Sequence, residues 1–157
     1  MGKKFFAWLD QHILTLITGI LIVVIPLYPK IPLAEVIQGY IVRLRLEDLL
    51  VLFACFIYLV QLVRGKIKLP SNRVAKYIYL YIAIGLLSTL SAIFVVKTVP
   101  MIKVHVLKIF FHLFRRIEYF SLFFIGYSAI RTKKDLILFV KIALLSLVGV
   151  VIYGMGQ

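Results

Sequence analysis

The chain has 157 residues, 63% hydrophobic and 16% charged, and its 19 Lys and Arg residues against 6 Asp and Glu give a formal net charge of +13. Soluble proteins average about 45–50% apolar and about 25% charged residues, and a chain of this length has too little interior to bury so much apolar surface. The composition therefore excludes a soluble or disordered chain, the single cysteine excludes a disulfide scaffold, and the aliphatic runs between the charges argue against nucleic-acid binding.

The apolar runs predict an all-α, polytopic transmembrane helix bundle with about five spanning helices, because about 20 helical residues cross the hydrocarbon core. The first run follows Asp10 and is broken from Pro26 onward by a proline-rich loop. The second is short unless its helix begins near Leu44, whereas the third is uninterrupted. The fifth contains only Lys141, whose charge can reach the interface. The expected spans are 11–29, 44–63, 77–96, 112–130 and 136–153.

The fourth segment is less regular than the others. Its helical, mostly apolar pattern is interrupted by Lys108, by the pair Arg115-Arg116 and by Glu118. The apolar stretch that follows is too short to span alone. Two interpretations stay open: one long helix that carries charge at depth, or a surface helix that bends into a short span.

Basic residues predict the orientation, because the cytoplasmic loops of membrane proteins are enriched in Lys and Arg. Five spans place ten of them on one side and eight on the other. The first group is Lys3, Lys4, Arg64, Lys66, Lys68, Arg73, Lys76, Arg131, Lys133 and Lys134; the second is Lys30, Arg43, Arg45, Lys97, Lys103, Lys108, Arg115 and Arg116. We expect the first side, with the N-terminus, to be cytoplasmic. An outer side this basic suggests that its charges are retained for a ligand.

One candidate anion-binding cluster opens the second span, in the sequence Arg-Leu-Arg-Leu-Glu-Asp. On a helix, Arg43 lies four residues from Glu47 and Arg45 three residues from Asp48, so both pairs can form ion pairs. Charges at the mouth of a span are costly unless they are paired or functional. The cluster predicts either a helix start with ion pairs or an outward-facing site for an anionic group.

A second cluster lies in the fourth segment. Arg115 can pair with Glu118, three residues further on, and Arg116 then needs a carboxylate from another helix, a lipid headgroup or a substrate phosphate. The planar guanidinium suits phosphate, although interfacial arginines also bind lipid phosphates. The three histidines form no ligand set, and no metal site, cofactor motif or nucleophile with its base is indicated.

Four short motifs, taken in order, resemble the amino-terminal part of bacterial O-antigen ligase and O-antigen polymerase-like proteins. They are Pro-Leu-Tyr-Pro-Lys-Ile-Pro at 26–32, Arg-Leu-Glu-Asp at 45–48, Arg-Arg-Ile-Glu-Tyr at 115–119 and Tyr-Gly-Met-Gly-Gln at 153–157. The resemblance covers nearly the whole chain. It implies a multi-pass protein of the bacterial inner membrane that acts, without a cofactor, on glycans linked to undecaprenyl pyrophosphate in surface polysaccharide assembly.

The resemblance also implies roles for residues of both clusters. Carrier phosphates would be contacted by Arg43, Arg45, Arg115 and Arg116, and these would be oriented by Glu47, Asp48 and Glu118. Family members have more helices and a later catalytic portion, so residues 1–157 are expected to form a single transmembrane domain, an N-terminal fragment of a longer lipid-linked glycan transferase. Catalytic residues, the chain's own catalytic competence and its oligomeric state are left open. The alternatives are a transporter or flippase component and a structural membrane subunit, neither with covalent chemistry.

Overall fold

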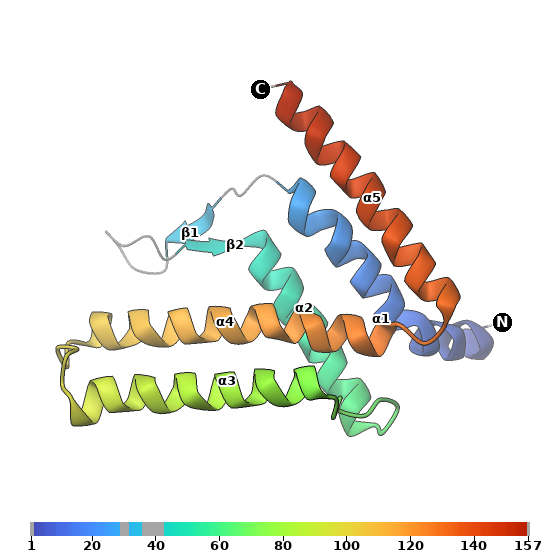
Figure 1. Cartoon of the computed structure of the whole chain (residues 1–157). Helices are drawn as coiled ribbons and strands as arrows, with labels where there is room; N and C mark the ends of the chain where they lie inside the picture. Colours follow the sequence, from blue (N-terminus) through green and yellow to red (C-terminus); the bar gives the residue numbers. More distant parts are fainter. Residues whose placement is uncertain (1, 29–31, 36–42, 157) are drawn as a thin grey trace. The chain divides into compact units, whose positions relative to one another are not determined.

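A computed structural model describes residues 2–28, 32–35 and 43–156, with side chains for 10, 12–28 and 45–156. Helices dominate the described chain, as expected (Figure 1). The elements are α1 (Gly2–Leu27), β1 (Pro32–Glu35), β2 (Arg43–Arg45), α2 (Leu46–Val63), α3 (Arg73–Leu90), a π-helical segment η1 (Ser91–Val95), α4 (Lys103–Ala129) and α5 (Lys133–Met155). The short strands β1 and β2 pair with each other.

Among the described residues, three helical stretches are long and apolar enough to cross a membrane: α2, the continuous stretch of α3 and η1 (Arg73–Val95), and α5. They correspond to the second, third and fifth predicted spans. The apolar part of α1, His12–Leu27, is shorter. Helix α4 is not among these three stretches, because charged side chains interrupt its apolar sequence. Membrane-spanning character is therefore supported for three helices, and a total of five spans stays a prediction.

Most large apolar side chains on these three helices are exposed. Leu52 of α2 is 69% exposed, Leu87 of α3 65% and Leu145 of α5 74%. Exposed apolar surface on this scale is unfavourable in water, since burial of such surface is the main driving force of folding. The same surface is at no disadvantage against lipid chains, so the outer faces of these helices fit a bilayer.

The described chain divides into two compact units. The first contains α1, α2, α5 and the last residues of α4 from Ile125 onward. Its buried side chains follow helical spacing: Leu14, Ile17, Thr18 and Leu21 on α1, and Val51, Ala54, Tyr58 and Gln61 on α2. Positions three, four and seven residues apart share one helix face. Each helix therefore turns a single face into the interior of the unit.

Pro26 stands inside the last turn of α1, and the helix ends one residue later at Leu27, within the proline-rich segment predicted to end it. Proline has no N–H, and the carbonyl of Ile22, four residues earlier, therefore lacks its usual helical donor. The hydroxyl of Ser146 on α5 donates to that carbonyl oxygen at 3.2 Å. A neighbouring helix thus supplies the hydrogen bond that proline removes, which lets α1 continue to Leu27.

Helices α1 and α5 run in the same direction. Contacts advance together along both: Gly19 faces Ile142, Ile22 faces Ser146, and Leu27 faces Gly149. A Cβ atom placed on Gly149 would come within 2.9 Å of Leu27 Cδ2, so the glycine permits a close approach there. If all helical segments span, two parallel helices must have an odd number of crossings between them, and three helical segments lie between α1 and α5 in the chain.

The second unit contains an antiparallel pair, α3 and α4 up to Phe124 (Figure 1). Tyr79 stacks on Phe124 with ring centroids 5.2 Å apart, and Tyr81 meets the edge of Phe120 at 5.3 Å. Further along the pair, Gly85 of α3 faces Leu113 of α4: a Cβ atom at Gly85 would lie 3.5 Å from Leu113 Cδ1, an ordinary van der Waals distance. Aromatic pairs at these distances add to apolar packing. The fourth segment is one continuous helix, Lys103–Ala129, so it does not bend as the second of its two predicted forms requires.

Candidate functional site

The first predicted cluster lies at the junction of β2 and α2. Helix α2 begins at Leu46, not near Leu44, so Arg43 and Arg45 are on an extended strand. The predicted helical spacing of Arg43 and Glu47 is therefore wrong. For Arg43 the structure describes the backbone only. The physical reason for the later start is a helix cap: a carboxylate oxygen of Asp48 accepts the backbone N–H of Arg45 at 2.9 Å, and Arg45 has extended backbone angles.

The guanidinium of Arg45 contacts a different acid from the one predicted. Its Nη1 donates to Glu47 Oε1 at 3.0 Å, whereas Asp48 binds the Arg45 backbone. The side chain of Glu47 is only 13% exposed and that of Arg45 30%. Three of the predicted residues, Arg45, Glu47 and Asp48, are thus brought together, with one guanidinium held by a mostly covered carboxylate.

The second cluster lies halfway along α4. The helix has 27 residues, and Arg115 and Arg116 stand at its midpoint, about 20 Å from either end at about 1.5 Å per residue. Arg115 is half-buried, Arg116 is exposed and Glu118 is half-buried. Glu118 follows one turn after Arg115, and its backbone carbonyl accepts the hydroxyl of Ser121 at 2.6 Å. Sequence reasoning placed these charges on a helix correctly, but the midpoint position follows only from the observed helix ends.

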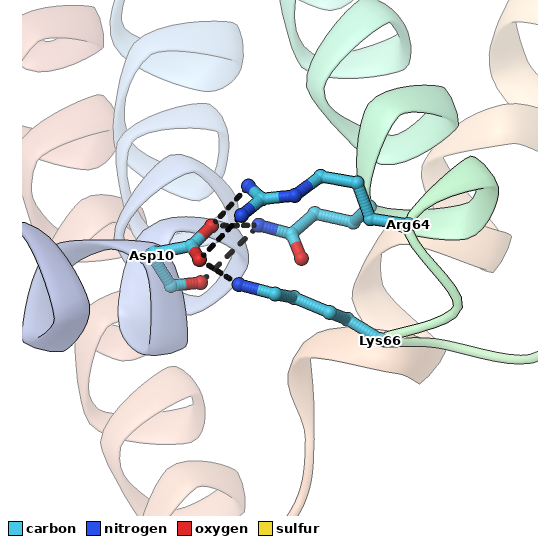
Figure 2. A network of polar contacts seen from close by, with 4 residues as sticks. Asp10, Arg64 and Lys66 are labelled. Carbon is cyan, nitrogen blue, oxygen red and sulfur yellow. Dashed lines mark hydrogen bonds and ion pairs between the residues drawn. The ribbon is translucent and has the colours of Figure 1, made fainter.

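The best-defined polar network of the described residues involves none of the predicted site residues (Figure 2). A carboxylate oxygen of Asp10, on α1, accepts from Arg64 Nη1 at 2.8 Å, and the other accepts from Nη2 at 3.1 Å. Lys66 pairs with the same carboxylate. Gln61, only 2% exposed, donates to the Asp10 carboxylate at 3.0 Å and to its backbone carbonyl at 3.2 Å.

This network fastens the start of α1 to the end of α2. One carboxylate receives two cations and an amide, a geometry in which charge-assisted hydrogen bonds are strong. It acts as a structural clamp, because the acid and both cations are already engaged with one another. The sequence carries a weak signal of it: Asp10 is the only acid among the first 34 residues, and a strongly basic loop follows the second long apolar run.

Among the residues whose side chains the structure describes, no group of three or more His, Cys, Asp or Glu could hold a metal ion. Cys55 is half-buried and forms no disulfide. The chemistry offered by the described side chains is therefore that of guanidinium and ammonium groups with a few carboxylates. Such an arrangement can bind and orient an anion.

The fold and its charges define a helical membrane protein with one arginine-containing cluster at the start of α2 and another on α4. Comparisons with protein families, with curated proteins and with solved structures found no match for this chain. Its function is therefore argued from its own residues.

Proposed function

We propose that this chain is the amino-terminal membrane part of an O-antigen ligase- or polymerase-like protein of the bacterial inner membrane. It acts on glycans linked to undecaprenyl pyrophosphate. The observation that carries the proposal is the position of Arg115 and Arg116 at the midpoint of an otherwise mainly apolar 27-residue helix. The identity of the substrate is proposed from the resemblance of the four motifs, in their order along the chain, to this family.

A midpoint arginine is costly if α4 crosses the membrane. Insertion scales put the cost of one arginine at a helix centre at about 3 kcal/mol, and such residues usually face the bundle interior or a watery cavity and mark a functional site. An anionic partner offsets that cost. The pyrophosphate of a polyprenyl carrier is an anionic partner of this kind, because its negative oxygens lie next to a hydrocarbon chain. The planar guanidinium of arginine matches the geometry of those oxygens.

In the proposed reaction, the bond between the anomeric carbon of the glycan and the pyrophosphate oxygen breaks, and an acceptor hydroxyl oxygen bonds to that carbon. The hydroxyl proton goes to a base that is not assigned among these residues. The pyrophosphate leaves with increased negative charge. Guanidinium groups fixed beforehand around that charge lower the barrier, because they stabilise the transition state more than the bound substrate.

Arg45 fits a supporting role in phosphate binding. Its guanidinium has five N–H donors, and the contact with Glu47 uses one of them. The carboxylate therefore holds the guanidinium in place and leaves donors for an anion. The cap that Asp48 forms on the backbone of Arg45 fixes the chain at the same point. These contacts support the orienting function that the family resemblance implies for both acids.

Transfer of lipid-linked glycan in membranes that contain the complete protein with Arg116→Ala tests the proposal. Loss of a positioned charge donor typically lowers turnover by about a hundredfold or more, and we expect a loss of that order. Lys141→Ala is the matched control, since it also removes an exposed cation from an apolar helix. Unchanged transfer with Arg116→Ala, at equal protein level, would remove the arginine role and favour a transport or purely structural protein.

A further inference from the structure

Two basic segments that are far apart in the sequence meet at one end of the first unit. The end of α2 reaches the start of α1 through the bonds of Arg64 and Lys66 to Asp10. The turn between α4 and α5 reaches α1 five residues further along that helix, where the hydroxyl of Thr15 donates to the carbonyl of Ala129 at 3.3 Å. This basic end is formed by Arg64, Lys66, Lys68, Arg131, Lys133 and Lys134.

The two acids at the basic end are already engaged. Asp10 is bound by Arg64, Lys66 and Gln61. Asp135 caps α5, because one of its oxygens accepts the N–H and the hydroxyl of Thr132 at 2.8 and 2.9 Å. In the described part of the chain, no carboxylate lies within salt-bridge range of Lys68, Lys133 or Lys134, and all three are exposed. Three cations are therefore left to an external partner.

Apolar surface adjoins these cations directly. Val63, the residue before Arg64, is 85% exposed, and Leu136 and Ile137, which follow Asp135, are 47% and 53% exposed. A soluble anion would use only the charges. A phospholipid uses both features, since its phosphate reaches the lysines while its acyl chains cover the apolar side chains beside them.

We propose that the basic end binds the headgroups of anionic phospholipids in the membrane leaflet that faces it. The preference comes from Lys68, Lys133 and Lys134, while the clamp at Asp10 holds the α2 segment beside the α4–α5 turn. Phosphatidylglycerol, which carries one negative charge, is the simplest lipid of this chemistry. The inference does not depend on the proposed transfer reaction, because it concerns residues that have no part in that site.

The only tryptophan of the chain reports on this end, because Trp8 precedes Asp10 by two residues on α1. The full chain is placed in phosphatidylcholine vesicles with increasing amounts of dibrominated phosphatidylglycerol, and in a second series with dibrominated phosphatidylcholine. Quenching of Trp8 gives the ratio of the two lipids' binding constants. One cation near an anionic surface contributes about fivefold to partitioning, so we expect the native ratio to exceed about five.

The triple variant Lys68→Gln, Lys133→Gln, Lys134→Gln should lower the ratio to near one. The matched control removes three cations that lie outside the basic end, by Lys97→Asn, Lys103→Gln and Lys141→Gln, and should keep the native ratio. Lys97 takes asparagine because its φ of 52° suits that residue. A high concentration of sodium chloride should lower this ratio for the native chain. The salt series therefore tests the proposal even if the triple variant misfolds.

A native ratio near one would overturn the proposal, and so would an equal loss in the control variant. Inorganic phosphate distinguishes a lipid from a free anion. If phosphate abolishes the preference at an ionic strength where chloride does not, the basic end binds soluble phosphate, and the lipid assignment is wrong.

Discussion

Single hydroxyl groups complete the hydrogen bonding of helix backbones in this protein. The Ile22 carbonyl lacks its helical donor because of Pro26, and Ser146 supplies one. The carbonyl of Ala129, at the end of α4, is among those that no residue of its own helix can satisfy, and it accepts the hydroxyl of Thr15. An unsatisfied carbonyl is expensive where water is excluded, so these two side chains stabilise helix ends as well as helix contacts.

Ser146→Ala should lower the free energy of unfolding by about 1 kcal/mol, the usual range for a hydrogen bond between membrane helices. The loss should shrink in a Pro26→Ala background, because alanine restores the backbone N–H that reaches Ile22. Unfolding of the four chains of this double-mutant cycle in mixed detergent micelles gives the coupling energy. Equal losses in both backgrounds would contradict the explanation. Ser88→Ala, at an exposed position on α3, is the control.

Helices α1 and α2 are joined by a polar clamp at one end and by apolar faces along their length. Arg64 and Lys66 are 51% and 36% exposed, so their bonds to Asp10 are partly screened by solvent. Gln61 is buried and donates to the same carboxylate. The carboxylate therefore accepts from a buried amide and pairs with two partly exposed cations at the same time.

Asp10→Asn keeps an oxygen acceptor for Gln61 but removes the negative charge, and we expect it to cost about 1 kcal/mol of stability. Arg64→Gln should cost a similar amount, and the double variant should cost less than the two separate losses together, since both remove one interaction. Detergent unfolding measures all three. Arg73→Gln is the matched control, because Arg73 is exposed and lies within salt-bridge range of no described carboxylate. Strict additivity would show that the contact between Asp10 and Arg64 contributes nothing to stability.

Hydropathy predicted where the helices lie but not where they begin and end. The start of α2 depends on the cap that Asp48 forms on Arg45, and α1 passes through Pro26 because Ser146 approaches from α5. The ion pair predicted between Arg43 and Glu47 assumed a helix that already includes Arg43, whereas α2 begins at Leu46. Contacts over long sequence separations, such as Asp10 with Arg64, leave no periodic signal in the chain. Arg115, Arg116 and Glu118 were found because they interrupt an apolar helix.

Helix directions within each unit agree with a chain that crosses the membrane at every helix. Five alternating crossings would make the first and fifth helices parallel and the third and fourth antiparallel. Parallel α1 and α5 and antiparallel α3 and α4 fit both conditions. The predicted five-span topology places the loop after α2 in the cytoplasm and the loop before α4 outside.

Cysteines at Lys68 and Lys103 test that topology, because α3 and η1 separate the two positions. The single native cysteine is first removed by Cys55→Ser. A membrane-impermeant maleimide applied to intact cells should then label Lys103→Cys and leave Lys68→Cys unlabelled, and permeabilisation should expose both. Labelling of both positions in intact cells, or of neither, would mean that α3 with η1 does not cross. It would also move Lys68 or Lys103 to the other side, and the charge difference from which the orientation was inferred would no longer hold.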